Sequence, residues 1–447
     1  MNSRKQSRPA HTPVAALLRG LIGLLCLLSG IFGRPSFAQP MTPHALELAD
    51  GRQVTLSLPT AFSIDIAAQG LHRVRFFAVS PDHRVFVTDM ENLQDNSLGR
   101  VYVLGGWNER THTFSRKIVY LDHLRNPNNV AFYTDPKTSQ SWIYVPLTDR
   151  LLRYKYSPGD NAPTGAPEVL ARYPDYGLNY KYGGWHLTRT VAFAQLHGKT
   201  SLFVSVGSSC NACEEKEPVR ASLQRMNPDG TGQVKVAAGL RNAVGLAYFP
   251  TLDGGSLFAT NQGDDHLGDF KPDETFFELD ANDHPGPISG TVAANYGWPT
   301  CYFANGTVHP DPLISAPKAA DHIFPPPPAG PAPKQFDCSK VPPAYATFPA
   351  HSSALGLEYF DDSNSILKGS FMVALHGAGH PKIGAGYSVV RFTPGNRKPQ
   401  DFITGFLVTE AGKAVVKGRP CGLLRTGPDS FLLSDDHDGV IYSIHPK

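Results

Sequence analysis

The sequence predicts an all-β protein, a six-bladed β-propeller with a Pro-rich loop excursion between its fourth and fifth repeats. Three observations support this prediction: a two-strand unit that recurs six times, a high content of turn-forming residues, and no sustained helical periodicity after the N-terminal segment. Of 447 residues, 42 are glycine and 39 are proline, while only 18% are charged. Glycine and proline interrupt helices and form tight connections, so this composition favours strands joined by turns.

Each copy of the repeat contains a short apolar strand, a polar turn and a second strand rich in Val, Phe or Leu. In chain order the paired strands are 74–79 with 85–89, 129–133 with 142–145, 190–193 with 202–207, 244–248 with 257–260, 355–359 with 371–375, and 422–424 with 431–435. Short alternating strands at this spacing are typical of propeller blades. The competing interpretation is a pair of β-sandwiches.

The interval between the fourth and fifth copies is much longer than the others. It contains Pro325 to Pro328 and further prolines up to Pro343. Because proline cannot donate a ladder hydrogen bond, these residues do not fit a central strand. We therefore predict a loop excursion from a single propeller rather than a second domain.

The N-terminus has the features of a secretory signal peptide. Basic residues precede an apolar run at 20–32, and Ser36-Phe37-Ala38 places small residues where a signal peptidase reads them. We predict cleavage after Ala38, which gives a signal peptide over 1–38 and a propeller over 39–447 that is periplasmic or secreted. The apolar run is short for a transmembrane span. An uncleaved membrane anchor is the alternative, and membrane contact is expected only in that case.

Export places the cysteines in an oxidising compartment, where disulfides persist. Cys210 and Cys213 are close enough in sequence to close a local loop, and we expect them to be bonded. Glu214 follows them where a covalently attached haem requires histidine, so this is not a c-type haem site.

A second cysteine pair, Cys301 and Cys338, flanks the Pro-rich excursion and is expected to pin it down by a disulfide. Cys421 is left over, and we interpret it as a small buried hydrophobic residue. The formal net charge of +2 offers no basic face of the kind that nucleic acid requires, so that partner class is excluded.

Propellers bind ligands at the axis, on the face where loops from all the blades meet, so polar residues beside the inner strands are the site candidates. Several motifs lie there: His186-Leu187-Thr188-Arg189, 239–246, 262–269, 295–299, 418–423 and Ser434-Asp435-Asp436. Together they resemble the soluble pyrroloquinoline-quinone (PQQ) sugar dehydrogenases of the glucose/sorbosone dehydrogenase family, most closely the sorbosone dehydrogenase branch. The resemblance covers nearly the whole chain after the N-terminal segment.

The resemblance implies roles for individual residues. His186 is similar in position to the family's catalytic histidine, and imidazole suits removal of a hydroxyl proton near neutral pH. Arg241 and Asn242 resemble the family's cofactor-contacting pair, and Arg419 resembles a later cofactor arginine. A guanidinium binds carboxylates and stabilises negative oxygen, so Arg241 is also expected to assist catalysis.

The resemblance also implies a calcium ion, and three positions of this chain depart from the glucose-oxidising branch. The family's calcium is held by carbonyl oxygens of the loop that Gly263 and Asp264 occupy, where it polarises the quinone. That branch has a cofactor-binding lysine where this chain has His376, and a second arginine where Cys421 stands. The loop of that branch also continues Gly-Pro where this chain has Gly263-Asp264. These changes favour the sorbosone branch, and we assign His376 to the cofactor site.

The predicted function is oxidation of an aldose or aldosone by a quinoprotein oxidoreductase. His186 accepts the proton while hydride passes to PQQ, with Ca²⁺ assisting. Because the chain carries no haem motif, electrons are expected to leave to an external acceptor, a cytochrome or a quinone. Two alternatives remain: a non-catalytic propeller that binds a protein or glycan, and a calcium-dependent lactonase-type hydrolase.

Overall fold

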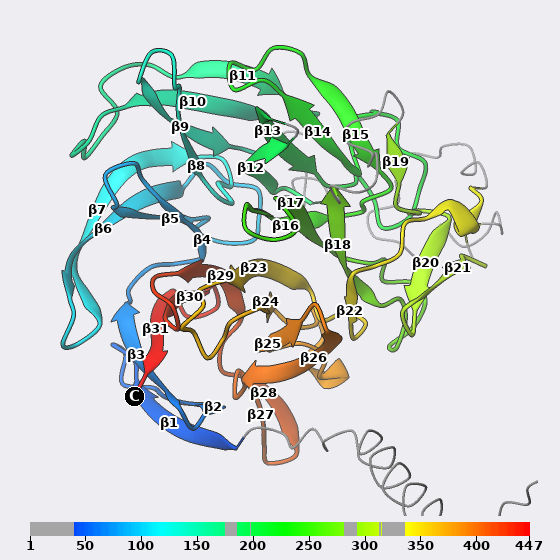
Figure 1. The fold of residues 1–447 in the computed structure, drawn as a ribbon. Helices are drawn as coiled ribbons and strands as arrows, with labels where there is room; N and C mark the ends of the chain where they lie inside the picture. Colours follow the sequence, from blue (N-terminus) through cyan, green and yellow to red (C-terminus); the bar gives the residue numbers. More distant parts are fainter. Residues whose placement is uncertain (1–39, 175–185, 197, 281–292, 313, 315–335) are drawn as a thin grey trace, which may run out of the picture. The chain divides into compact units, whose positions relative to one another are not determined.

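The computed structural model describes residues 40–174, 186–196, 198–280, 293–312, 314 and 336–447 (Figure 1). These residues form β-strands and two short 3₁₀ helices, Cys338–Lys340 and Pro381–Ile383, and they contain no α-helix. Nowhere in these ranges does a helix have the length and apolar character needed to cross a membrane. The predicted signal peptide lies outside the described residues.

Six sheets, here called blades 1 to 6, make up most of residues 41–447. Blade 1 contains β4 (Val74–Val79), β5 (Val85–Asp89), β6 (Gly99–Asn108) and β7 (Thr113–Leu124). Blade 2 contains β8 (Ala131–Thr134), β9 (Ser141–Pro146), β10 (Arg150–Tyr156) and β11 (Glu168–Arg172). Blade 3 contains β12 (Arg189–Leu196), β13 (Lys199–Val206), β14 (Ser222–Met226) and β15 (Val234–Ala238), and is extended by β19 (Ala294–Asn295). Blade 4 contains β16 (Ala243–Phe249), β17 (Ser256–Asn261), β18 (Glu274–Asp280) and β22 (Ala346–Phe348). Blade 5 contains β23 (Ala354–Phe360), β24 (Ser370–Leu375), β25 (Ser388–Thr393) and β26 (Asn396–Ile403). Blade 6 contains β29 (Pro420–Arg425), β30 (Phe431–Asp435), β31 (Val440–Pro446) and β3 (Phe62–Ala68).

The blades close into a ring. The first strand of each blade contacts the first strand of the next, and β29 of blade 6 contacts β4 of blade 1. Blade 6 is completed by β3, which comes from the start of the chain and pairs antiparallel with the C-terminal strand β31. Figure 1 shows these two ends of the propeller, blue and red, side by side. The predicted six-bladed β-propeller is therefore confirmed.

The inner strands approach one another closely at three glycines. A side chain on Gly245, Gly356 or Gly422 would collide with the backbone of the next blade, at Leu355, Cys421 and Arg75 respectively. Glycine is needed at these positions because no Cβ fits between the two backbones. The close approach holds the loops that follow these strands in fixed relative positions.

Hydroxyl side chains add bonds between neighbouring blades. Thr88 on β5 donates to the Asn128 carbonyl at 2.7 Å, and Thr260 on β17 donates to the Leu355 carbonyl at 2.8 Å. Both hydroxyls are buried, where a satisfied hydrogen bond contributes roughly 1 kcal/mol. Each donor lies on the second strand of its blade and binds the backbone at the inner edge of the next one.

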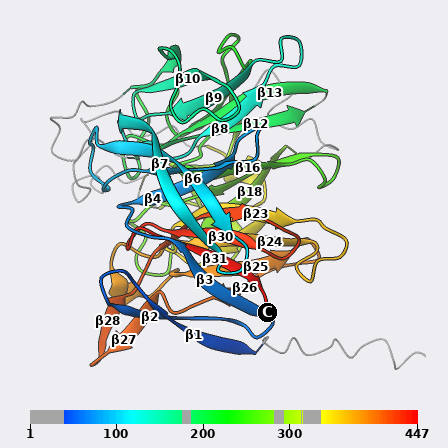
Figure 2. The same cartoon turned by 90° about the vertical axis from the view of Figure 1, so that its left-hand side faces the viewer.

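Three additional hairpins lie outside the blades. They are β1 (Met41–Glu47) with β2 (Gln53–Pro59), β20 (Cys301–Ala304) with β21 (Thr307–Pro310), and β27 (Leu407–Glu410) with β28 (Lys413–Val416). The first and third lie side by side in both views (Figure 2), and Ser57 on β2 exchanges backbone hydrogen bonds with Thr404, in the segment that leads into β27.

The long interval after the fourth repeat interrupts a blade. The strands that flank it, β18 and β22, pair with each other in blade 4. Most of the Pro-rich stretch lies outside the described residues. Cys301 and Cys338 are joined by a disulfide, which bonds hairpin β20–β21 to the 3₁₀ helix before β22.

Candidate active site

A cavity of about 1020 Å³ opens where the inner strands meet. Most of its lining residues come from the start of the first strand, or from the segments before it or after the second strand, of blades 1, 3, 4, 5 and 6; Glu274 begins the third strand of blade 4. It brings together six of the residues predicted from the sequence: His186, Arg241, Asn242, Gly263, His376 and Arg419. Val244 and Leu355 also line it and pack with Phe76 and Cys421 in one apolar cluster, so part of the cavity wall is hydrophobic.

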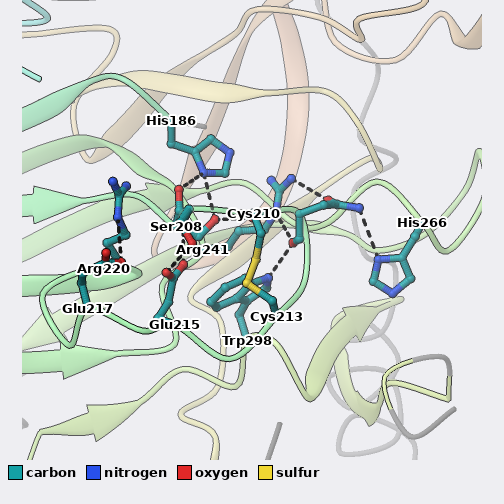
Figure 3. The surroundings of a disulfide bond; sticks show 12 residues. His186, Ser208, Cys210, Cys213, Glu215, Glu217, Arg220, Arg241, His266 and Trp298 are labelled. Carbon is teal, nitrogen blue, oxygen red and sulfur yellow. Dashed lines mark hydrogen bonds and ion pairs between the residues drawn. A yellow bond between two sulfur atoms is a disulfide. The ribbon is translucent and has the colours of Figure 1, made fainter. Parts of the chain in front are cut away.

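His186 is held by the segment that follows β13. Its Nδ1 lies 3.1 Å from the Ser208 carbonyl oxygen and 2.9 Å from Ser208 Oγ (Figure 3). A carbonyl can only accept, so Nδ1 carries the proton and Nε2 is the basic nitrogen. Burial, together with the Arg241 guanidinium, lowers the pKa of His186 well below its ordinary value, although Asp265 opposes the shift. His186 is therefore a neutral imidazole near pH 7.

Arg241 is held by the loop that the Cys210–Cys213 disulfide closes. Its Nε donates to the Asn211 carbonyl at 2.9 Å, and its terminal nitrogen donates to Asn211 Oδ1 at 2.7 Å. The same terminal nitrogen lies 3.0 Å from Asp265 Oδ2. The guanidinium is thus fixed from two sides at the cavity wall.

The disulfide bonds Cys210 to Cys213 and packs against Trp298 (Figure 3). Trp298 Nε1 donates to the Asn211 carbonyl at 2.9 Å, and Ser208 Oγ donates to the Cys210 carbonyl at 2.6 Å. One short loop therefore orients both His186, through Ser208, and Arg241, through Asn211. This use of the cysteine pair was not evident from its spacing.

Asn242 begins a chain of hydrogen bonds that joins blades 4 and 5. Its amide donates to Gln262 Oε1 at 2.7 Å, and Gln262 donates to Ser353 Oγ at 2.5 Å. All three residues line the cavity. The Asn242 amide is therefore held by its own neighbours in a fixed orientation at the wall.

The opposite part of the wall is organised by a buried carboxylate, Asp436. It accepts a hydrogen bond from His376 Nε2 at 2.7 Å and forms an ion pair with Arg75 at 2.6 Å. Burial alone would raise the pKa of Asp436, but His376 and Arg75 outweigh it and hold the pKa far below its ordinary value. A carboxylate only accepts, so His376 Nε2 carries a proton, and its Nδ1 faces the Arg419 guanidinium at 3.4 Å.

Arg419 anchors the segment that leaves β24. It donates to the carbonyls of Gly377 at 2.9 Å and Ala378 at 3.0 Å, and to the Tyr387 hydroxyl at 3.0 Å. Its guanidinium also lies over the Tyr387 ring, 4.8 Å from the centroid. Arg419 is thus pre-positioned beside His376.

Only one of the two predicted calcium-binding positions lines the cavity. Gly263 is part of the wall, whereas Asp264 is 3% exposed and lies beside a separate small void. The Asp264 carboxylate faces His266 at 3.3 Å, and His266 bonds Asp311 at 2.8 Å. Burial raises the pKa of Asp264 to about 6. The Asp264 side chain therefore belongs to the contact with hairpin β20–β21.

The charged or titratable lining residues that the sequence analysis missed include Arg73, Arg75, Glu274 and His351. Arg73 and Arg75 stand at the entry to the first strand of blade 1, as Arg241 and Arg419 do in blades 4 and 6. A search for basic residues at this point of every repeat would have found them. Glu274 and His351 carry no comparable sequence signal.

The unusual protonation of these two residues arises from their surroundings. Burial raises the pKa of Glu274 to about 8, so its carboxyl is neutral near pH 7. A hydrogen bond to Asp265 raises the pKa of His351 to about 9, so that imidazole is charged. Four arginines and His351 therefore make the wall predominantly cationic.

Cys421 lies beneath the cavity, fully buried, as expected for a small hydrophobic residue. Burial raises the pKa of its thiol to about 12, so it is neither a nucleophile nor a ready metal ligand. Cys421 stands where the glucose-oxidising branch has a second arginine, and Arg73 and Arg75 contribute positive charge to the same cavity.

Comparison with known proteins gives a consistent family assignment. No curated protein sequence matches the chain. The calcium structure of a Trichoderma reesei protein of Carbohydrate-Active Enzymes Family AA12 superposes with a TM-score of 0.64 at 16% identity, over 92% of this chain and 100% of that one. The PQQ domain of Coprinopsis cinerea pyranose dehydrogenase, in its holo form, gives a TM-score of 0.61 at 17% identity, over 92% and 98%.

The PQQ-bound aldose sugar dehydrogenase from Streptomyces coelicolor gives a TM-score of 0.52 at 16% identity, over 87% of this chain and 100% of that one. At such identities the similarity is evidence of a common fold. The sorbosone branch stays a prediction. The TrAA12-like family model matches residues 57–446, nearly the whole propeller, and the chain therefore belongs to the TrAA12-like family.

Proposed function

We propose that this protein is a quinoprotein sugar oxidoreductase, which oxidises an aldose or aldosone and passes the electrons to an external acceptor, a cytochrome or a quinone. The observation that carries the proposal is a neutral, oriented histidine, His186, in one cavity with four arginines. A proton acceptor and a cationic binding wall are what oxidation of a sugar with a carboxylated quinone requires.

The chemistry of the cavity fits PQQ, a planar molecule that carries carboxylates. Arg73 Nε is buried and has no hydrogen-bond acceptor among the described residues, so a donor is available in the wall. Arg241 and Arg419 are already fixed by neighbouring groups and would hold carboxylate or quinone oxygens without further ordering. Val244 and Leu355 offer an apolar surface for a flat ring system.

When bound, PQQ supplies the acceptor for the hydride from the sugar carbon. His186 Nε2 accepts the hydroxyl proton, since Ser208 keeps the other ring nitrogen protonated. The Arg241 guanidinium stabilises negative charge that develops on oxygen nearby. Asn242, held by Gln262, is an oriented donor for an oxygen of the cofactor or the sugar.

Calcium is the second component of the proposal. Gly263 offers a carbonyl oxygen and Asp269 a carboxylate at the wall, and Ca²⁺ prefers such oxygen ligands. One solved structure of the Trichoderma reesei AA12 protein is described as its calcium structure. We infer that the ion binds this loop and acts as a Lewis acid on the quinone.

The hydrolase alternative fits the cavity less well. A calcium-dependent lactonase needs several anionic or amide oxygens that converge on the metal. Here Glu274 is neutral near pH 7, and Asp265 is engaged by Arg241 at 3.0 Å and by His351 at 3.3 Å. Asp265 is therefore held by two cations of the wall, and Glu274 accepts backbone hydrogen bonds from Gly263 and Ser353.

We further propose a periplasmic or secreted location and a sorbosone-like substrate. The N-terminal signal features support export, and two disulfides are consistent with an oxidising compartment. The residues His376 and Cys421, which differ from the glucose-oxidising branch, support the substrate assignment.

The test is reconstitution of the purified protein with PQQ and Ca²⁺, followed by turnover with an artificial electron acceptor on a panel of aldoses and sorbosone. We expect activity only when both additions are present. His186→Ala should bind PQQ, seen by its absorbance, yet show almost no turnover. Absence of PQQ binding by the wild-type protein would contradict the proposal and favour a binding or hydrolytic propeller.

A further inference from the structure

A second cavity, of about 670 Å³, lies between blades 6 and 1. It is lined by the turn between β4 and β5, the turn between β6 and β7, and the turn between β29 and β30. Antiparallel strands reverse direction at each turn, so these turns lie at the opposite end of the blades from the axial cavity. Whatever binds here is separate from the proposed redox site.

Three potential metal ligands meet at the edge of this cavity. Asp65 is on β3, His112 is in the turn between β6 and β7, and His445 is on β31. Asp65 Oδ2 lies 3.0 Å from His112 Nδ1 and 2.8 Å from His445 Nε2. Two imidazoles thus point their ring nitrogens at one carboxylate oxygen, and both histidines line the cavity.

The second nitrogen of His445 fixes the orientation of its ring. Nδ1 lies 2.8 Å from the Pro446 carbonyl oxygen, which can only accept, so Nδ1 carries a proton. Asp65 Oδ2 can only accept, so without an ion Nε2 donates to it, and a bound ion would take the place of that proton. Metal-ligating histidines commonly donate their other N–H to a backbone carbonyl, as His445 Nδ1 does here, which orients Nε2 toward the position between Asp65 and His112.

We propose that Asp65, His112 and His445 bind a divalent first-row transition-metal ion such as Zn²⁺. Two imidazole nitrogens and one carboxylate oxygen suit such an ion, whereas Ca²⁺ prefers an all-oxygen set. The separations of 2.8 and 3.0 Å are close to the ligand–ligand distances of roughly 2.9–3.4 Å that metal bonds of about 2.0–2.1 Å produce.

Binding requires a small movement of one ring. The two imidazoles are stacked, with centroids 3.7 Å apart and an interplanar angle of 27°, so their planes must open for both nitrogens to face one ion. His112 belongs to a hairpin turn and its side chain is 26% exposed, which leaves it room to rotate. The remaining coordination positions of the ion then face the second cavity.

The position of the site gives the ion a structural consequence. Asp65 and His445 lie on the two strands that complete blade 6 from opposite ends of the propeller, and His112 belongs to blade 1. An ion bound by all three residues joins the first strand of the ring, the last strand and the neighbouring blade. Because the site does not exist in the unfolded chain, metal binding should stabilise the closed ring.

The test is calorimetric titration of the untagged protein with Zn²⁺ in the presence of saturating Ca²⁺. We expect one Zn²⁺ site that His112→Ala and Asp65→Asn each weaken by at least about tenfold. The matched control is His123→Ala, which removes an exposed histidine of the same blade, 82% exposed and outside both cavities. This control should leave the affinity unchanged. Asp65→Asn preserves shape, so it remains informative if an alanine variant folds poorly.

A second measurement identifies the ligands. Cu²⁺ bound to the wild-type protein should show electron paramagnetic resonance couplings from two imidazole nitrogens, and from one in His112→Ala. Zn²⁺ should also raise the midpoint of thermal unfolding by a few degrees in the wild type but not in Asp65→Asn. Absence of Zn²⁺ binding by the wild type, or binding that both variants leave unchanged, would overturn the proposal. None of these measurements depends on PQQ or turnover.

Discussion

The two sides of the axial cavity hold the same residue type in different ways. On the side of blades 3 and 4, His186 bonds the Ser208 carbonyl, a neutral acceptor. On the side of blades 5 and 6, His376 bonds the Asp436 carboxylate, and its second nitrogen faces Arg419. Burial lowers the pKa of both histidines, most strongly for His186, whereas Asp436 opposes the shift at His376.

The difference shows that the hydrogen-bond partner, rather than the residue type, decides what a cavity histidine can do. The lone pair of His376 is directed at a cation, so this ring is suited to binding and positioning. His186 has its proton on the nitrogen that faces Ser208, so its Nε2 is suited to accept a proton. The predictions below test this division, from the largest expected effect to the smallest.

Substitution of the two histidines should separate turnover from cofactor binding. His186→Ala should lower kcat by about two or more orders of magnitude and leave the Kd for PQQ nearly unchanged, because it removes the general base. His376→Ala should mainly raise the Kd for PQQ, because it disturbs Asp436 and Arg419. Reconstituted turnover and PQQ titration measure both. Equal effects of the two variants on kcat would refute the division.

Asp436→Asn should destabilise the fold by about 3–5 kcal/mol, since it leaves the buried Arg75 without its counter-ion. The pKa of Asp436 is lowered in the folded state, so its contribution is present at neutral pH and is lost only in strong acid. Denaturant unfolding at pH 7 measures the change. Asp50→Asn, in an exposed ion pair with Arg52, is the control and should change stability far less, because solvent screens this pair. Equal stability losses would contradict the role of Asp436.

The two disulfides should rank in opposite order for stability and for activity. Removal of Cys301–Cys338, which closes the longer loop, should cost about 4 kcal/mol, against about 2 kcal/mol for Cys210–Cys213. The Cys210→Ala/Cys213→Ala variant should nevertheless lose more kcat, because its loop orients His186 and Arg241. Thermal unfolding and turnover of the two double variants give the comparison. A greater kcat loss in the Cys301→Ala/Cys338→Ala variant would argue against this.

The pH profile of kcat/KM should report the protonation of His186. Its neutral form is the active base, and its pKa is well below the ordinary value, so the acidic limb should fall well below pH 6.5. Asp265→Asn should move that limb lower still, because the Asp265 carboxylate raises the pKa. An acidic limb at or above pH 6.5 would assign the proton acceptor to another group.

Glu274→Gln should have the smallest effect. The carboxyl is neutral at pH 7 because burial raises its pKa to about 8, and glutamine reproduces a neutral side chain of the same shape. Turnover at pH 7 should therefore remain nearly unchanged. A large loss would indicate that an ionised Glu274 binds the metal, as a calcium-dependent hydrolase requires.

Much of the fold could be predicted because the repeat is local. Apolar and polar side chains alternate along several of the strands with a period of two residues. Gly245, Gly356 and Gly422 recur at equivalent points of three copies. The pairing of β3 with β31 could not be predicted in this way, since β3 resembles any half-buried strand and its partner lies at the other end of the chain. Such long-range pairing depends on closure of the whole ring.

The sequence by itself determined the six-bladed architecture and the positions of His186, Arg241, Asn242, Gly263, His376 and Arg419 at the inner ends of the blades. Only the tertiary structure decided that Asp264 turns to His266, that Asn211 holds Arg241, and that Asp436 binds both His376 and Arg75. Strand periodicity is a local property of neighbouring residues. Hydrogen-bond partners and pKa values depend instead on groups that meet only when distant blades close around one axis.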